Sequence, residues 1–542
     1  MSIVRFLRLI PLIAVSALAA DYAAEGKLWW SHIQFLADDA LEGRNIGTPG
    51  FLKAVQYVET QFEKLGLKPA GTSGYLQPIK FETRLISEST VELVRDGATD
   101  TIAPAEAILS SRGDPAPSVE APMVFVGYGM QIPEAHYDDL AGVDLKGKIA
   151  VYVNAPAPVD VSGNVKSHYS SSSERWAVLK RAGAVGVATL PNARPNAPAN
   201  PNDPAAQAGQ GAGGGRGAGG GRTPQPSVVL ADHDLQDSAG QTVSLTITRR
   251  GAEKFFAGTG HTLDEIDELV KANKPLPHFP LVGTLRAKAT VQRGALEAPN
   301  VAALYPGSDA KLKDEYVIMS AHLDHLGVGR PVNGDSIYNG AMDDASGIAS
   351  MLEVARLLKE SGAKPKRSVL FVAVTGEEKG ELGSHYFAAH PTVPARNIVA
   401  DINLDMFLPL YALKVIEVQG LTESSLGDHV RAAAKALGVE VQTDREPEQN
   451  RFIRSDQYSF IRRGVPSLAF KFGYEFGSPE EKIRRDWVKN VYHKPNDDLS
   501  QPVDPAAAAL FDRIIASLVQ RVADTPARPT WNDDSFFERF AK

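Results

Sequence analysis

The second half of the chain alternates strand-like and helix-like segments, and this alternation most constrains the fold. From about residue 282 onward, apolar runs of strand length occur at residues 316–321, 368–375, 397–404 and 465–472. Amphipathic segments lie between them, and the one at 347–358 has the apolar spacing of a helix. Strands that are apolar on both faces and alternate with helices are typical of a parallel sheet covered on both sides. The sequence therefore predicts an α/β fold with a mixed, mainly parallel sheet.

Three of these predicted strands end at side chains that can bind a metal ion. His322 follows the first run, Glu377 and Glu378 follow the second, and Asp405 follows the third. In open parallel sheets, ligands bind beyond the carboxyl ends of the strands. We therefore expect these side chains to meet at one edge of the sheet.

Two further segments carry residues of the same chemical kind. Asp343 and Asp344 stand before the helix predicted at 347–358, and His493 lies in a Tyr-His-Lys-Pro segment. Paired acids can simply cap a helix, and a single histidine is common without a metal. Asp405 resists such an explanation, because an unpaired carboxylate at the end of an apolar strand is costly. Five such segments in one domain favour a metal centre.

In their order and spacing, these motifs resemble those of the dizinc exopeptidases. That family includes bacterial leucyl-type aminopeptidases, glutamate carboxypeptidase and the transferrin receptor. The N-terminal motif Leu41-Glu42-Gly43-Arg44 also matches the family, and the β-rich region at 86–281 looks like the protease-associated domain that many members carry as an insertion. The matching motifs are His-Leu-Asp-His from 322, Gly-Ala-Met-Asp-Asp-Ala-Ser-Gly from 340, Gly-Glu-Glu-Lys-Gly from 376, Asn-Leu-Asp-Met from 403 and Tyr-His-Lys-Pro from 492.

The resemblance implies that Asp343 bridges two Zn²⁺ ions. His322 and Asp405 would complete one site, and Glu378 and His493 the other. The charges agree with this, since three carboxylates and one bridging hydroxide cancel the four positive charges of two zinc ions, and a buried site tolerates a neutral cluster best. Nitrogen and oxygen ligands suit zinc, and cobalt or manganese could replace it.

Two more residues receive catalytic roles. Glu377 stands beside a ligand but is not needed for the metals, so we expect it to take a proton from the metal-bridging water and pass it to the leaving amine. Asp324 is placed to accept the far N–H of His322 and so to fix its tautomer. The resemblance also implies a cis peptide bond between Asp343 and Asp344. Together these features predict a zinc-dependent exopeptidase acting on peptides, and within that class an aminopeptidase.

Three alternatives stay open at this point. A carboxypeptidase of the same family should need an arginine cluster for the terminal carboxylate of its substrate, and Arg451, Arg454, Arg462 and Arg463 are available. A glutaminyl-peptide cyclotransferase has a similar fold but works with one zinc ion. A binding or receptor module would keep the fold and typically lose ligands, whereas no ligand position is missing here.

The remaining features concern location and partners. Arg5 and Arg8 precede an apolar run of about a dozen residues and the small residues Ala17-Leu18-Ala19, a pattern typical of a signal peptide over residues 1–20. No later segment is apolar enough to span a membrane, and a net charge of −8 over 542 residues argues against a nucleic-acid partner. Cysteine is absent, so any metal must be held by His, Asp and Glu. We expect an exported protein, either periplasmic or secreted.

The length of the chain predicts more than one domain, since 542 residues exceed an ordinary single core. We expect residues 21–85 and 282–542 to form the peptidase domain and residues 86–281 to form the insertion. Within the insertion, residues 191–226 are rich in Pro, Asn, Ala and Gly. Such a segment buries too little apolar surface to offset its ordering entropy, so we predict a disordered loop there.

Overall fold

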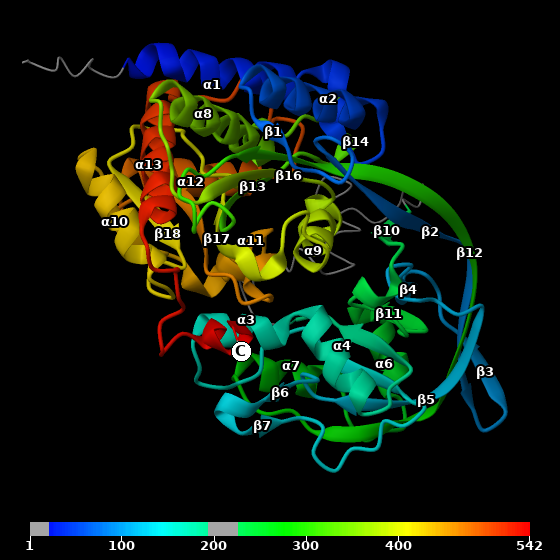
Figure 1. Ribbon diagram of the computed structural model, residues 1–542. Helices are drawn as coiled ribbons and strands as arrows, with labels where there is room; N and C mark the ends of the chain where they lie inside the picture. The colour runs from blue at the N-terminus through cyan, green and yellow to red at the C-terminus, as the bar shows by residue number, and fades with distance from the viewer. Residues whose placement is uncertain (1–20, 193–225, 542) are drawn as a thin grey trace, which may run out of the picture.

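The computed structural model describes residues 21–192 and 226–541. The predicted signal peptide, residues 1–20, lies outside the described residues. Of the predicted disordered loop at 191–226, only residues 191, 192 and 226 are described. Within the described residues, two layered parts share one continuous sheet (Figure 1). Among the helices of this portion of the chain, none is long and apolar enough to cross a membrane.

The C-terminal part contains the mixed, mainly parallel sheet that the alternation predicts. Its strands are β12 (His278–Tyr305), β13 (Tyr316–His322), β16 (Ser368–Val374), β17 (Ile398–Asn403), β18 (Val415–Gln419), β19 (Glu440–Thr443) and β20 (Ser467–Phe472). They lie in the order β19–β18–β20–β17–β13–β16–β12. β13 is parallel to β16 and β17, and β17 is parallel to β20. Antiparallel pairing occurs toward the two sides, between β12 and β16 and between β18 and β20.

Helices cover both faces of this sheet (Figure 1). One face carries α1 (Tyr22–Leu36), α2 (Pro49–Lys64), α8 (Ser346–Glu360) and α13 (Pro505–Asp524), and the other carries α9 (Leu382–Ala389) and α11 (Gln457–Ile461). Successive side chains along each strand point to opposite faces of the sheet, so strands that are apolar throughout bury side chains on both faces. Met319 of β13 is buried in the core of the first layer, whereas its neighbour Ile318 packs with Phe387 of α9 and Phe460 of α11. The α/β prediction is confirmed. The remaining helices of this part are α10 (Leu426–Ala436) and α12 (Pro479–Asn490).

Two long strands join the C-terminal part to the region predicted as an insertion. β2 (Leu76–Arg95) and β12 pair antiparallel along most of their length, and the expected boundaries at 86 and 281 both fall within these strands. Figure 1 shows them as an arc that connects the two parts. The sheet then continues through β12–β5–β8–β9–β11–β4 around a second hydrophobic core.

The elements of this second part are short. Its main strands are β4 (Ala107–Leu109), β5 (Ser118–Val126), β8 (Ile149–Val153), β9 (Gly186–Leu190), β10 (Ser227–Leu230) and β11 (Val243–Ile247). Its helices are α3 (Gly163–Ser170), α4 (Ser172–Arg181), α6 (Arg249–Phe256) and α7 (Leu263–Lys271). Smaller strands elsewhere are β1 (Lys68–Pro69), β3 (Ala98–Thr101), β6 (Gln131–Ile132), β7 (Tyr137–Asp138), β14 (Gly327–Val332) and β15 (Asp335–Tyr338).

A buried arginine ties the N-terminal helices to the loops that leave the sheet. Arg44 is fully buried, and its guanidinium donates to four main-chain carbonyls. These belong to Leu36 (2.5 Å), Asn339 (2.5 Å), Gly340 (3.0 Å) and Leu323 (3.0 Å). Burial lowers the pKa of Arg44 to about 10, so the side chain stays charged at neutral pH. One side chain therefore sets the relative positions of α1, the loop after β13 and the segment before α8.

Replacing Arg44 with methionine should strongly destabilise the protein. Methionine fills much of the same volume but leaves the carbonyls of Leu36, Leu323 and Asn339 without donors, whereas that of Gly340 keeps the N–H of Ala345. An unsatisfied buried group costs about 1–3 kcal/mol. A total loss of about 3 kcal/mol or more should lower the melting temperature by about 3 °C or more in calorimetry, given the unfolding entropy of a chain of this length. Arg250→Met changes an exposed arginine and is the matched control. Equal melting temperatures for the two variants would contradict the role assigned to Arg44.

Candidate metal centre

The five side chains predicted as metal ligands converge at the carboxyl edge of the sheet. His322 is the last residue of β13, Asp405 stands two residues beyond β17, and Glu378 lies in the short turn η5 (Glu377–Lys379) after β16. Asp343 precedes α8, and His493 follows α12. These side chains are only 1 to 15 % exposed. The parallel strands and two flanking segments thus deliver five ligand-type groups to one buried place.

Asp343 lies at the middle of the group. Its Oδ1 is 3.1 Å from Nε2 of His322, and its Oδ2 is 3.1 Å from Nε2 of His493. Nε2 of His322 is also 3.8 Å from Oδ1 of Asp405. Nε2 of His493 is also 3.3 Å from Oε2 of Glu378. Two ligands about 2.0–2.1 Å from a tetrahedral zinc ion lie about 3.3 Å apart. The contacts on each side of Asp343 are therefore close to the separation of ligands that share an ion.

Buried atoms without partners give an independent test of whether a cation fits here. Oδ1 of Asp405 and Nε2 of His325 make no hydrogen bond within the described residues. Nδ1 of His325 pairs with Oε1 of Glu378 at 2.7 Å. Buried polar atoms without partners are costly, whereas a bound cation would satisfy carboxylate oxygens and imidazole nitrogens together. The residues present fit a divalent metal ion.

The two adjacent glutamates differ in their electrostatic surroundings. Burial opposes ionisation of Glu378, but His493 and His325 outweigh it and hold the pKa of Glu378 well below its ordinary value. Burial raises the pKa of Glu377 well above its ordinary value, and the carboxylates of Glu378 and Asp456 add to this against the opposite effect of His322. Glu378 is therefore an ionised carboxylate of the kind that binds metals, whereas Glu377 is suited to exchange a proton.

The loop that carries His493 is tied directly to the segment that carries Asp343. Asp497 accepts the main-chain N–H of Met342 through Oδ1 at 2.9 Å and that of Asp343 through Oδ2 at 3.1 Å. Its own carbonyl accepts the N–H of Ala341 at 3.0 Å. These bonds fix the position of the His493 loop relative to Asp343, as two ligands of one ion require.

The backbone around Asp343 also agrees with the sequence analysis. The peptide bond between Asp343 and Asp344 is cis, as the resemblance implies. At Gly347, a Cβ atom would lie 2.2 Å from the carbonyl oxygen of Leu404. Only glycine therefore lets the start of α8 approach the end of β17 closely enough to bring Asp343 beside Asp405.

The role predicted for Asp324 needs correction. Nδ1 of His322 donates to the main-chain carbonyl of Asp324 at 3.0 Å, not to its carboxylate. Oδ1 of Asp324 accepts the N–H of Glu377 at 3.2 Å instead. The reason is the strand order: β16 lies beside β13, so a side chain just beyond β13 reaches across to the turn that follows β16. Asp324 thus fixes His322 through its main chain and Glu377 through its side chain.

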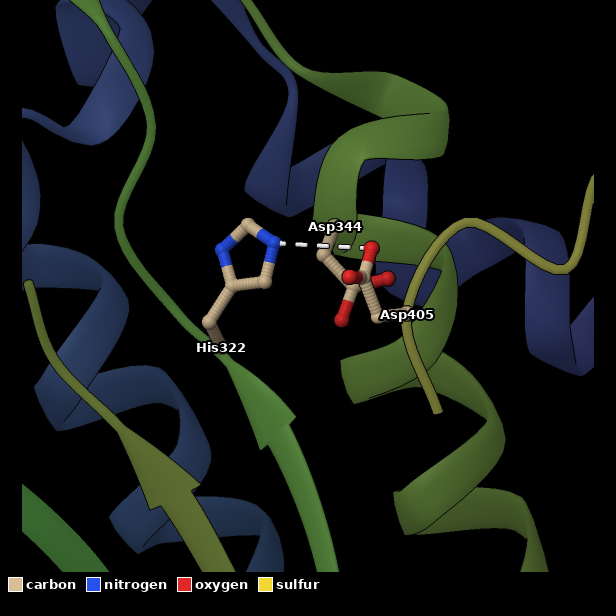
Figure 2. A group of neighbouring side chains, drawn as sticks. All are labelled: His322, Asp344 and Asp405. Atoms are coloured by element: carbon tan, nitrogen blue, oxygen red, sulfur yellow. Dashed lines mark ion pairs between the residues drawn. The ribbon is translucent and has the colours of Figure 1, made fainter. Parts of the chain in front are cut away.

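Two acidic or basic groups near the ligands were not assigned from the sequence. His325 is fully buried against Glu378, although it ends the His-Leu-Asp-His motif and could have been noticed there. Asp344 has a carboxylate oxygen within 4.8 Å of ligand atoms of His322 and Asp405, and Figure 2 shows these three side chains together. Asp344 also has a structural role, because its Oδ1 accepts the N–H of Gly347 in the first turn of α8 at 2.9 Å.

Comparisons with known proteins cover the part of the chain that carries this site. The family model of peptidase family M28 matches residues 300–519, which contain all five predicted ligands. A probable zinc metalloprotease of Pyrenophora teres f. teres is 38% identical over 337 residues, 55% of this chain and 69% of that protein. A probable leucine aminopeptidase 2 of Aspergillus oryzae is 31% identical over 256 residues, 45% of this chain and 48% of that protein. Carboxypeptidase Q of Xenopus laevis is 33% identical over a shorter stretch of 133 residues, 23% of this chain and 26% of that protein.

A solved structure has the same fold along nearly the whole chain. The aminopeptidase from Aneurinibacillus sp. strain AM-1 aligns with a TM-score of 0.53 over 93% of this chain and 95% of that chain, at 22% sequence identity. Likeness at that identity supports the fold, and the family model and the Pyrenophora relative support the family. The chain therefore belongs to peptidase family M28 and is a zinc-dependent metallo-exopeptidase.

Proposed function

We propose that the protein is an aminopeptidase that removes N-terminal residues from peptides and holds two zinc ions per chain. The observation that carries the proposal is the position of Asp343, whose two oxygens each lie 3.1 Å from a different histidine. His322 and Asp405 are assigned to one ion, Glu378 and His493 to the other, and Asp343 to both. Cobalt or manganese could occupy the same nitrogen and oxygen ligands.

The protein groups around the ions have distinct tasks in hydrolysis. Zinc supplies a Lewis acid that lowers the pKa of water and polarises the scissile carbonyl. Glu377 takes the proton that the attacking water loses and returns it to the leaving amine. Asp324 keeps the turn of Glu377 in place by accepting its N–H. The hydrogen bond from Nδ1 of His322 to the Asp324 carbonyl leaves Nε2 of His322 free to bind metal.

The arginines considered for a carboxypeptidase have partners within the protein or are exposed. Arg451 and Arg462 pair with acidic side chains at 2.7 and 3.5 Å. Arg454 donates to a main-chain carbonyl at 2.9 Å, and Arg463 is exposed. These contacts favour an aminopeptidase over a carboxypeptidase that would use this group. The Aspergillus oryzae relative, which carries the name leucine aminopeptidase, supports the same choice.

The charge around the site also favours a substrate with a free amine. The acidic groups of Glu377, Asp456 and Glu381 lie within electrostatic range of one another, and burial raises the pKa of each. A substrate ammonium placed beside them would favour their ionised forms. We therefore assign this side of the site to the first residue of the substrate.

The domain organisation and the location remain part of the proposal. Residues 21–85 and 282–542 would form the peptidase domain, and residues 86–281 would form an inserted domain like the protease-associated domain. A separate hydrophobic core between Val91 and Ala287 supports this division. The pattern of residues 1–20 supports export to the periplasm or the medium.

Glu377→Gln should remove nearly all turnover and leave the metals in place. Glutamine keeps the shape of the side chain but cannot accept a proton, and a positioned general base contributes roughly 10²–10⁴-fold. We expect kcat on an aminoacyl substrate to fall by that factor, while elemental analysis still finds two zinc ions per chain. Glu440→Gln, at an exposed position of β19, is the control. Retained turnover in Glu377→Gln would refute the assignment of the base.

Asp343→Asn should cost the protein both zinc ions. An amide has one neutral oxygen and a nitrogen that does not bind zinc, so the side chain can no longer serve two ions. After dialysis, elemental analysis should find two zinc ions in the wild-type protein and in Asp335→Asn, an exposed control. Full occupancy in Asp343→Asn would contradict the shared ligand. One zinc ion in the wild type, together with cyclisation of N-terminal glutamine, would favour the cyclotransferase instead.

A substrate screen should separate the two kinds of exopeptidase. We expect hydrolysis of leucyl peptides and leucine p-nitroanilide, no hydrolysis of their N-acetyl derivatives, and loss of activity with 1,10-phenanthroline, because the site is built for a free amine and requires zinc. Release of the C-terminal residue from N-acetyl peptides would show carboxypeptidase activity and overturn the proposal.

A further inference from the structure

Lys471 is a lysine in the interior of the main sheet. It lies in β20, whose six residues are all buried, and it is only 8 % exposed. A buried ammonium is costly unless a polar group of the protein replaces its water. The neighbouring strand offers such a group, because Glu417 of β18 stands directly opposite Lys471 in the antiparallel pair. Cross-strand partners of opposite charge are expected to form an ion pair.

Glu417 binds a different cation instead. One of its oxygens lies 2.9 Å from a guanidinium nitrogen of Arg484, and both side chains are at most 3 % exposed. The ammonium of Lys471 donates to the main-chain carbonyl of Asp405 at 2.6 Å. Asp405 stands just beyond β17, the strand that runs parallel to β20. A buried charge is therefore directed at the turn that carries a predicted metal ligand.

The turn that carries Asp405 has a backbone conformation that needs support. The chain bends at Asp405, between Leu404 and Phe407, which are both fully buried. Met406 and Leu408 have φ angles of 49° and 57°. Side chains other than glycine rarely adopt such left-handed conformations, which persist only where the surrounding contacts enforce them. The shape of this turn therefore depends on the groups that bind it.

Hydrogen bonds hold this turn on both sides of Met406. The N–H of Met406 itself donates to Oδ1 of Asp344 at 3.3 Å. After Met406, a main-chain bond of 2.8 Å joins the turn to the end of β20. Before it, the bond from Lys471 acts on Asp405 itself. In this conformation the carboxylate of Asp405 lies 3.8 Å from Nε2 of His322 (Figure 2).

We propose that Lys471 is a positioning residue for the zinc ion assigned to His322 and Asp405. Its ammonium fixes the turn of Asp405, so that the carboxylate is held ready for that ion. The other ion is assigned to Glu378 and His493, whose loops are held by different hydrogen bonds. Lys471 should therefore control the affinity of one ion selectively. This inference rests on the proposed two-zinc function and deepens it.

Zinc titration of the metal-free protein in competition with a chromophoric chelator tests this role. Loss of a group that supports a metal ligand typically weakens metal binding about 10- to 100-fold. In Lys471→Met, we expect the dissociation constant of one ion to rise by that factor and that of the other ion to stay at the wild-type value. Asp405→Asn identifies the affected ion, because it removes a ligand of that ion alone. Lys414→Met changes a lysine whose side chain is 75 % exposed, and it should keep both wild-type values.

Two further variants separate positioning from a general structural effect. If Lys471 acts through Asp405, adding Lys471→Met to Asp405→Asn should leave the affinity of the remaining ion unchanged. Lys471→Arg keeps a charged donor and should weaken the affected ion less than Lys471→Met does. A further loss in the double variant, the opposite order of the two single variants, or equal losses at both sites would overturn the inference. Tighter zinc binding in Lys471→Met would also overturn it, because the ammonium would then only repel the ion.

The failure of the proposed function gives a different result. Wild-type affinities for both ions in Lys471→Met would overturn the role of Lys471, while hydrolysis of leucine p-nitroanilide would leave the aminopeptidase in place. A single zinc ion in the wild-type protein would overturn the two-zinc proposal. Weaker binding of that single ion in both Lys471→Met and Asp405→Asn would still support the positioning role, whereas an unchanged affinity in Lys471→Met would overturn it.

Discussion

The hydrogen bonds of the buried Arg44 hold together the segments from which the metal centre is built. The guanidinium binds carbonyls of three separate segments, and two of these, the loop after β13 and the segment before α8, carry His322 and Asp343. Loop carbonyls in a dry interior need donors, and a guanidinium offers five N–H groups in a rigid plane. Asp497 extends the same scheme to the loop of His493 by accepting two main-chain N–H groups. The ligands thus stand on loops that are bonded to one another.

This rigidity lets the fold concentrate like charges in a small volume. Asp343, Glu378 and Asp405 are ionised, because the pKa of each carboxyl group is lowered. At Asp343 and Glu378, adjacent histidines outweigh the effect of burial. At Asp405, Lys471 and His322 together outweigh it. Separate carboxylates would move apart if their supports were flexible. Strand ends and bonded loops prevent this, so the anionic groups remain directed at a common point and the ions can bind without rearrangement.

Much of the fold and part of the site could be predicted because the sheet is parallel. Apolar runs mark the strands, and parallel strands deliver the residues after them to one edge, which places His322, Glu378 and Asp405 together. Asp343 and His493 could be joined to them only through the family resemblance, since neither follows a strand. The acceptor for His322 was predicted wrongly, because the conformation of the turn after β13 decides whether the carbonyl or the carboxylate of Asp324 faces the histidine. The same turn directs His325 toward Glu378, a contact that the sequence did not predict.

By itself, the sequence determined which elements form, which of their faces are buried and which ligand-type groups stand at their ends. These properties follow from apolar periodicity, which is local in the chain. Only the tertiary structure decided which atoms meet: that each oxygen of Asp343 faces its own histidine, and that Asp324 supports Glu377. Such contacts join residues far apart in sequence, and they depend on the packing of every element between them.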